Sequence, residues 1–299
     1  MRKEVQAVAP LNTDPNYKIV TADSSGTIEA RHDYQPRTTL TKAIFDFDGT
    51  ISLIRKGWMD VMVPYFVEVL VPFIKVEEDP QALRSLVLDN VMRLTGKQTI
   101  YQAMWLGEEV KSRGGDPLPP LDYKNEYLRR LETDAVNDRK AKLSARTISR
   151  EEFLVPGVIE LLEGLKACNV ELFLASGTNE RHVIFEAGLL DVAKYFGRHI
   201  YGARDEDFNF DKKQVIRQYI IEGCGVEGVN LVGFGDGFVE IQETMAVGGL
   251  GVAVLSDEEN PGSGLMEPFK REKLEVLQPQ IMVSDYRKID VLLDLLCLK

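Results

Sequence analysis

Cysteine is scarce in this chain of 299 residues: the only three are Cys168, Cys224 and Cys297. Their spacing fits neither a disulfide framework nor a zinc site, which excludes disulfide-rich secreted domains and structural zinc modules. Long apolar runs are also missing, since the stretch 61–74 is interrupted by one glutamate and two prolines and is too short to span a bilayer. The first residues lack the apolar core of a signal peptide. We therefore expect a protein of a reducing, cytoplasmic compartment with no membrane partner.

Positively charged residues are fewer than negatively charged ones. The chain has 36 lysines and arginines against 47 aspartates and glutamates, which gives a net charge of −11. Nucleic-acid binding requires a concentrated basic patch, whereas short clusters such as 139–142 are typical of a solvated helix surface. We therefore expect no nucleic-acid partner. The acidic balance is compatible with a site for a divalent cation.

From Lys42 onward, the chain alternates short apolar runs with helical patterns. The apolar runs are typical of strands buried on both faces, as in a parallel sheet, and helices separate them. This alternation predicts a doubly wound α/β fold with a parallel sheet. The predicted strands are 42–47, 170–176, 199–202, 230–236, 251–256 and 281–285.

One interval breaks the alternation, because no segment between residues 53 and 151 has convincing strand character. Asp79 and Pro80 are typical of a helix start, and further helices are expected from about Thr99 and over about 123–143. An insertion at this point would cover the carboxyl ends of the strands, where open α/β sheets bind ligands. Residues 1–40 show little periodicity and could form an arm or add a strand to the edge of the core. The predicted domains are this N-terminal arm (1–40), an α/β core (41–52 and 152–299) and a helical insertion (53–151).

Two acidic side chains, Asp46 and Asp48, stand at the end of the first predicted strand. Two carboxylates this close together are costly unless a cation separates their charges. Mg²⁺ prefers oxygen ligands and binds proteins through one or two carboxylates. The Asp-Gly pair at 48–49 is also a common turn, so this signal becomes specific only with others.

The other predicted strands also end in polar residues. Ser176 and Gly177 follow the second strand, where a hydroxyl and free backbone N–H groups could hold a phosphate oxygen. Two lysines, 212–213, open a helix although the helix dipole favours acids there. Asp236 ends the fourth strand, and Glu240 follows one helical turn later. Each feature alone is compatible with a cap or a surface loop, but together they indicate one anion-binding site that holds a cation.

These motifs, in this order, resemble those of the haloacid dehalogenase-like (HAD) hydrolase superfamily. The matching segments are DFDGT at 46–50, ASGT around Ser176, a lysine at 212 or 213, and GDGFVE at 235–240. The resemblance implies a Rossmann-like core. The place of the insertion, between the first two motifs, resembles the helical C1 cap of phosphoglycolate-phosphatase-like members.

The resemblance also implies catalytic roles. Asp46 would be the nucleophile that forms an aspartyl-phosphate, and Asp48 would be the general acid and then the general base. The lysine would neutralise charge on the nucleophile and the phosphate. We favour Lys212 over Lys213, because an apolar pair follows it at the spacing of the family motif.

Further residues would bind the phosphoryl group or the metal. The cofactor implied is Mg²⁺, and Glu240 is the weaker candidate ligand because the family motif often ends in aspartate. The candidate metal ligands are Asp46, Asp48 through its backbone carbonyl, Asp236 and Glu240. The candidate substrate-binding residues are Gly49, Thr50, Ser176 and Gly177, with Arg55 and Lys56 at the hinge.

The function expected from the resemblance is hydrolysis of a small phosphorylated metabolite. A roomy cap normally closes over a small molecule, such as a sugar phosphate or a phosphoglycolate-like acid. The presence of both Asp48 and Asp236 favours phosphate chemistry over dehalogenation. Two alternatives stay open: a phosphomutase of the β-phosphoglucomutase type, and a catalytically silent binding protein with the same fold.

Overall fold

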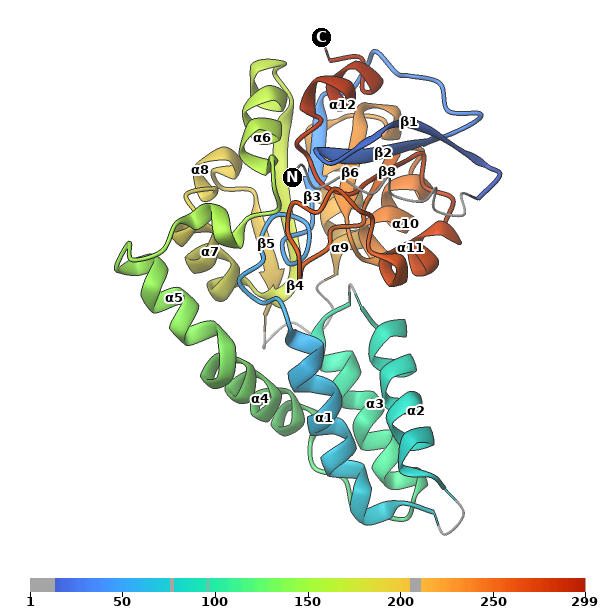
Figure 1. Cartoon of the computed structure of the whole chain (residues 1–299), viewed down its shortest axis with the longest axis vertical. Coiled ribbons are helices and arrows are strands. Elements are labelled where there is room, and N and C mark those ends of the chain that lie inside the picture. Colours follow the sequence, from blue (N-terminus) through green and yellow to red (C-terminus); the bar gives the residue numbers. More distant parts are fainter. Residues whose placement is uncertain (1–13, 76–77, 96, 205–210, 299) are drawn as a thin grey trace, which may run out of the picture.

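The computed structural model describes residues 14–75, 78–95, 97–204 and 211–298. An α/β core forms one end of the molecule, and a group of helices projects from it (Figure 1). Among the described residues, no helix is both long and apolar enough to cross a bilayer.

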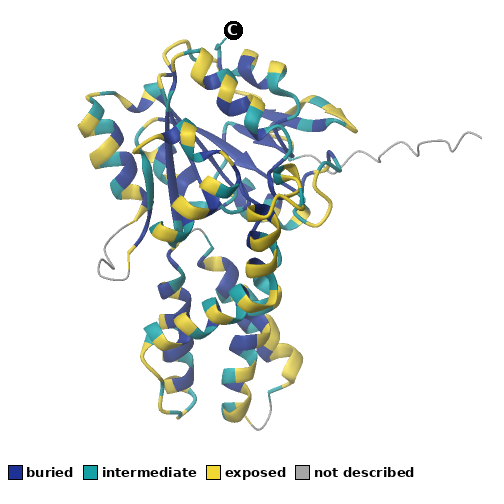
Figure 2. Ribbon diagram, turned by 90° about the vertical axis from the view of Figure 1, so that its left-hand side faces the viewer, coloured by how far each residue is buried: buried dark blue, intermediate teal, exposed yellow. Residues whose placement is uncertain are grey.

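The core contains one sheet of eight strands in the order β1-β2-β8-β7-β6-β3-β4-β5. Six of these strands run parallel and are buried by helices, which confirms the predicted α/β fold (Figure 2). Their bounds differ from the predicted ones by at most three residues. The parallel strands are β3 (Lys42–Phe45), β4 (Glu171–Asn179), β5 (Ile200–Ala203), β6 (Leu231–Gly235), β7 (Leu250–Val254) and β8 (Ile281–Val283).

The two remaining strands form a hairpin at the sheet edge, where β2 pairs antiparallel with β8. They are β1 (Tyr17–Asp23) and β2 (Gly26–Arg31). Of the two possibilities for the lead-in, these residues therefore add strands to the core, and the description of 1–40 as an arm is corrected for them. The sequence of β1 shows little alternation of apolar and polar residues, because Tyr17 is the only residue of this strand that is buried. Residues 1–13 of the predicted arm lie outside the described residues.

Helices of the core pack against the sheet and end or begin near its carboxyl edge. Lys212 opens a short helix that continues as a π-helix, η4. The helical elements are α6 (Val158–Ala167), α7 (Glu180–Leu189), α8 (Ala193–Phe196), α9 (Lys212–Gln214), η4 (Val215–Glu222), η5 (Gly228–Asn230), α10 (Phe238–Ala246), α11 (Pro268–Glu275) and α12 (Ile289–Leu295).

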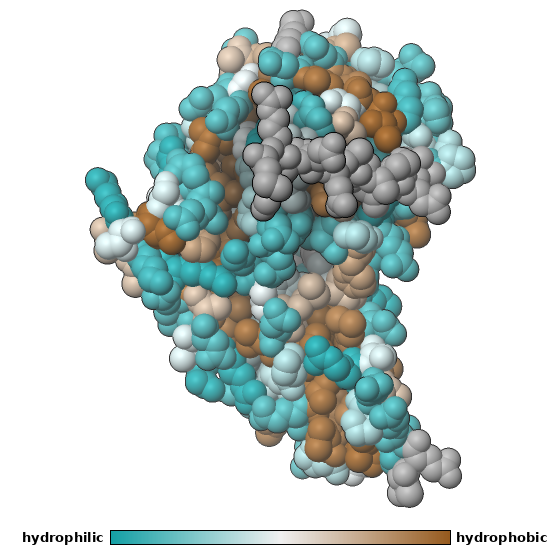
Figure 3. All heavy atoms as spheres, viewed as in Figure 1, coloured by the Kyte–Doolittle hydropathy of each residue, from teal (hydrophilic) through white to brown (hydrophobic). Residues whose placement is uncertain are grey.

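The helical insertion follows β3 and stands over the carboxyl ends of the strands (Figure 1). Hydrophobic residues gather between its helices, and the side chains buried there belong to the same hydrophobic cluster as those of the α/β core (Figure 3). The side chain of Asp79 accepts a hydrogen bond from the Gln81 N–H and caps a helix, as its sequence indicates. The elements are α1 (Trp58–Leu70), η1 (Val71–Phe73), α2 (Pro80–Arg93), α3 (Thr99–Ser112), α4 (Pro120–Leu131), the π-helix η2 (Glu132–Val136), α5 (Asn137–Ser144) and η3 (Arg150–Phe153).

The insertion touches the core directly above the second predicted motif. A Cβ atom on Gly177 would lie 2.8 Å from the carbonyl oxygen of Lys97, which belongs to the turn between α2 and α3. Only glycine permits this approach, because any larger residue would push the turn away. The turn therefore closes one side of the space above β4.

Candidate active site

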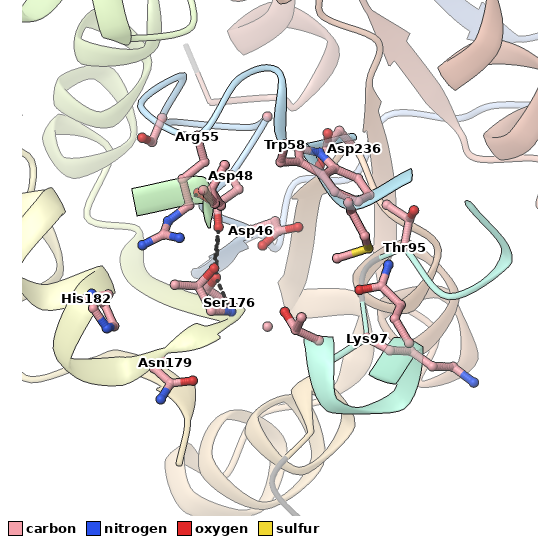
Figure 4. A pocket seen from close by; sticks show the side chains of 18 of the residues that line it. Asp46, Asp48, Arg55, Trp58, Thr95, Lys97, Ser176, Asn179, His182 and Asp236 are labelled. Carbon is pink, nitrogen blue, oxygen red and sulfur yellow. Dashed lines mark hydrogen bonds and ion pairs between the residues drawn. The ribbon is translucent and has the colours of Figure 1, made fainter. Parts of the chain in front are cut away.

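A pocket of about 110 Å³ lies where β3, β4 and β6 end, between the core and the insertion. Asp46 and Asp48 follow β3, Ser176 belongs to β4, and Asp236 follows β6. Figure 4 shows Asp48 directed toward Ser176. Parallel strands bring their carboxyl ends to one edge, so the polar strand ends meet there as the sequence indicates. Gly49, Gly177, Lys56 and Lys212 also line this pocket.

The first ionic contact of the site joins Asp46 to Lys212. The Lys212 Nζ atom lies 2.7 Å from Asp46 Oδ2 and 2.7 Å from Glu240 Oε2, and the lysine side chain is only 3% exposed. Burial raises the pKa of Asp46 well above its usual range, and the Lys212 charge opposes this rise. Burial would lower the pKa of Lys212, but the two carboxylates outweigh it and raise that pKa. Lys213 is exposed, so Lys212 is the lysine that lies in the site.

Glu240 is fully buried and has partners for both carboxylate oxygens. Its Oε1 atom accepts a hydrogen bond from the Gly237 N–H at 2.7 Å, and its Oε2 atom contacts Lys212. Glu240 therefore caps the start of α10 and holds the lysine. One oxygen each of Asp46, Asp236 and Glu240 lie within 4.8 Å of one another, a spacing that suits a metal ion. Carboxylate oxygens are the ligands that Mg²⁺ prefers, so the donor set fits this cation.

Asp48 has one bonded and one unbonded carboxylate oxygen. Its Oδ2 atom accepts a hydrogen bond from Thr178 Oγ1 at 2.8 Å and a longer one from Ser176 Oγ at 3.5 Å. Its Oδ1 atom is buried without a hydrogen-bond partner among the described residues, and Arg55 Nε lies 3.9 Å away. Burial raises the pKa of Asp48 to about 6, although the Arg55 charge opposes this rise. The carboxyl group can therefore gain and lose a proton near neutral pH.

Gly49 and Thr50 shape the site around Asp236. Gly49 has a φ of 74°, and a Cβ atom there would collide with the Asp236 carboxylate. Thr50 is fully buried, and its Oγ1 atom accepts a hydrogen bond from the Asp236 N–H at 3.0 Å. The Tyr286 hydroxyl donates to the Thr50 carbonyl oxygen at 3.0 Å. Thr50, a candidate substrate-binding residue, thus contacts Asp236 and does not line the pocket.

Arg55 lines the pocket, but acidic side chains hold its guanidinium group. Its Nη2 atom lies 2.6 Å from Glu186 Oε1 and 3.2 Å from Glu132 Oε1. Lys140 contacts the same two glutamates at 2.9 Å each. Glu132, His182 and Glu186 also have the spacing of a metal site, but the two cations already neutralise both carboxylates. We therefore assign this cluster to the contact between insertion and core.

A second lysine, Lys270 of α11, lies on the other side of the site and had no sequence signal. Its Nζ atom lies 2.9 Å from Asp236 Oδ2 and 2.7 Å from Glu258 Oε1. It also lies 3.1 Å from Ser256 Oγ, which donates to the Gly49 carbonyl oxygen at 2.7 Å. Burial would lower the pKa of Lys270, but the two carboxylates outweigh it and raise that pKa. Lys270 therefore fixes one oxygen of Asp236.

A family model described as haloacid dehalogenase-like hydrolase matches residues 43–243. The chain belongs to the haloacid dehalogenase-like hydrolases. This confirms the resemblance drawn from the motifs, and it confirms the hydrolase class. A comparison with curated proteins found no significant match.

Many solved structures share the fold of this chain. One is a predicted phosphoglycolate phosphatase from Haemophilus somnus, with 14% identity, a TM-score of 0.53 and coverage of 85% of this chain and 98% of that one. Another is a predicted phosphatase from Clostridium acetobutylicum, with 18% identity, a TM-score of 0.51 and coverage of 85% and 99%. A β-phosphoglucomutase from Clostridium difficile has 15% identity, a TM-score of 0.50 and coverage of 79% and 98%. At these identities the likeness shows the fold alone.

Proposed function

We propose that this chain is a Mg²⁺-dependent phosphatase that hydrolyses a small phosphorylated metabolite through an aspartyl-phosphate on Asp46. One observation carries the proposal. The buried Asp46–Lys212 ion pair and Asp48, whose pKa lies near 6, face the same small pocket. A carboxylate nucleophile divides a slow hydrolysis into two faster steps, and a second carboxyl group moves the proton that both steps need.

In the first step, an Asp46 oxygen attacks the phosphorus atom while the bond to the leaving oxygen breaks. Asp48, which holds a proton up to about pH 6, delivers that proton to the leaving oxygen. Thr178 and Ser176 fix the Asp48 carboxyl group from one side. Lys212 offsets the negative charge that Asp46 and the phosphoryl oxygens bring together.

In the second step, Asp48 accepts a proton from water as the water oxygen attacks the phosphorus atom. The bond between phosphorus and the Asp46 oxygen breaks, which releases orthophosphate and restores the free carboxylate. Ser176, Gly177 and Gly49 line the pocket and are proposed to bind the phosphoryl oxygens. In-line positioning and neutralised oxygens are what phosphoryl transfer mainly requires.

Asp46, Asp236 and the backbone carbonyl of Asp48 are proposed to hold Mg²⁺. When bound, the cation supplies positive charge that neutralises the phosphoryl oxygens. Thr50 orients Asp236 for this task, whereas Lys270 pairs with one oxygen of Asp236 and competes with the cation for it. Glu240 acts through Lys212, because both of its oxygens are already bonded.

The helical insertion is proposed to be a C1 cap that closes over the substrate, with residues 53–151 as the cap and 41–52 and 152–299 as the core. Sugar phosphates and phosphoglycolate-like acids are the substrate classes that the family resemblance favours. The three cysteines are free in the structure, which agrees with the reducing, cytoplasmic compartment that we propose.

Phosphate release from a panel of phosphorylated metabolites tests this function. The panel is assayed with Mg²⁺, with EDTA, and with an Asp46→Asn variant whose folding is checked by circular dichroism. Metal-dependent release that is lost in the variant is expected. Isomer formation without phosphate release would show that the protein is a mutase and not a phosphatase. No turnover of any compound by folded, Mg²⁺-loaded protein would favour a silent binding protein.

A further inference from the structure

A second cavity, of about 420 Å³, adjoins the catalytic pocket. It lies between α1 and α2 of the insertion and α10, α11 and the segment 256–259 of the core. The two cavities share four lining residues, which are Trp58, Thr95, Asp236 and Glu258. Figure 4 shows Trp58 and Thr95 on the Asp236 side of the catalytic pocket.

The sizes of the two cavities decide where the organic part of a substrate can lie. The catalytic pocket measures about 110 Å³. A phosphoryl group with a metal and its water would take up most of that space. Sites for small organic molecules measure about 300–1,000 Å³, a range that the second cavity reaches and the first does not. The second cavity therefore offers the larger space for the bulk of the leaving group.

The walls of the second cavity are mainly apolar. A group that is polar on all sides would lie partly against these apolar side chains, and a hydroxyl left unpaired there would cost free energy on leaving water. Aromatic rings offer a face to another ring, which makes an aromatic leaving group a better fit. The main apolar side chains are Trp58, Leu88, Met92, Phe238, Phe269 and Leu274.

The charge of the second cavity further limits which leaving groups can bind there. Six acidic side chains and two lysines line it. Lys270 is already paired with Asp236 and Glu258, and the Lys273 Nζ atom lies 4.5 Å from the centre of the Phe269 ring. A leaving group with its own carboxylate or second phosphate would be repelled, whereas acidic and aromatic groups together favour a cation.

We propose that the second cavity binds the leaving group of the substrate, and that this group is aromatic and neutral or cationic. The inference rests on the proposed phosphatase function and narrows it. It favours phosphate esters of such aromatic groups over sugar phosphates and phosphoglycolate-like acids as substrates.

Binding of phosphonates, which cannot be hydrolysed, tests this inference by calorimetry on the full chain with Mg²⁺. Methylphosphonate reaches only the catalytic pocket, benzylphosphonate adds a neutral ring, 4-(aminomethyl)benzylphosphonate adds a charged amine, and phosphonoacetate adds a carboxylate. Both ring compounds should bind at least tenfold more tightly than methylphosphonate, and phosphonoacetate should bind more weakly than methylphosphonate. Equal affinity of the benzyl and methyl compounds would overturn the inference.

Two variants locate the ring within the protein. Phe269→Ala removes an aromatic wall, and Leu88→Trp fills space in the cavity. Both should reduce the benzyl advantage at least fivefold and leave methylphosphonate affinity unchanged. Phe185→Ala, at a 54% exposed position on α7, is the matched control and should change neither affinity. A benzyl advantage that both cavity variants preserve would also overturn the inference.

The same data separate this inference from the proposed function. If methylphosphonate binds and the ring adds nothing, only the assignment of the second cavity fails. If neither the phosphonates nor orthophosphate bind in the presence of Mg²⁺, the proposed function fails, and the assignment of the leaving group fails with it.

Discussion

Replacement of Lys212 by methionine tests how the site is held together. The lysine is 3% exposed, and its Nζ atom lies 2.7 Å from a carboxylate oxygen of both Asp46 and Glu240. Methionine has a similar length, so the change removes the charge without opening a large cavity. Two buried carboxylates then lose their shared cation.

The expected cost follows from what is left unpaired. Removing one partner of a buried ion pair costs about 3–5 kcal/mol, because the other charge stays buried. For a chain of this size, we expect the midpoint of thermal unfolding to fall by roughly 5–15 °C in EDTA. Lys213→Met is the matched control, because Lys213 is the exposed neighbour on the same helix, and it should change the midpoint little.

Two further measurements refine this prediction. Adding Glu240→Gln to Lys212→Met removes one of the unpaired charges and should restore at least half of the loss, a non-additivity expected of contacting residues.

Burial raises the pKa of Asp46 above its unfolded value, so the folded state takes up a proton as the pH falls. The fall in the unfolding midpoint caused by Lys212→Met should therefore be larger at pH 8 than at pH 5. Equal midpoints for the Lys212 and Lys213 variants in differential scanning calorimetry would refute this reasoning.

Three further predictions concern other charges of the site. Lys270→Met removes a cation 2.9 Å from Asp236 and should tighten Mg²⁺ binding roughly tenfold by calorimetry; weaker binding would show that the lysine instead prepares the carboxylate. Because burial raises the pKa of Asp48 to about 6, its protonated form stabilises the fold below about pH 4, and this is lost as the pH rises through 6. Asp48→Asn should therefore raise the unfolding midpoint in EDTA at pH 8 but hardly at pH 4, and a uniform shift would contradict the assignment. Glu186→Gln leaves Arg55 short of a buried partner and should lower stability by about 3 kcal/mol in urea unfolding, whereas an unchanged midpoint would show that this contact does not join insertion and core.

The sequence predicted the parallel strands and the polar residues at their ends because both depend on short segments. Asp46, Asp48, Ser176 and Asp236 meet because parallel strands end at one edge of a sheet. The sequence limited the site lysine to Lys212 or Lys213. The structure decides between them, because Lys212 is buried and Lys213 is exposed. Local pattern and sheet geometry together are sufficient for this part of the site.

Other residues of the site could not be predicted, because their roles depend on contacts between distant segments. Lys270 lies in a polar helix near the C-terminus, where a charged residue usually indicates a solvated surface. Glu186 and Glu132 come from two helices that meet only when the insertion folds back onto the core. The sequence left open whether the segment before Lys42 forms an arm or adds a strand to the core, because the solvent-exposed edge strand β1 has almost no alternation of buried and exposed residues.

Trapping the phosphorylated enzyme tests the central claim most directly. The Mg²⁺-loaded protein is mixed with the best substrate of the panel, quenched in acid within one turnover and digested for mass spectrometry. We predict a phosphoryl group on the peptide that contains Asp46, absent from the Asp46→Asn variant and lost from the wild-type protein as orthophosphate appears. Full turnover by the variant, or wild-type turnover with the phosphoryl group on another residue, would contradict the account.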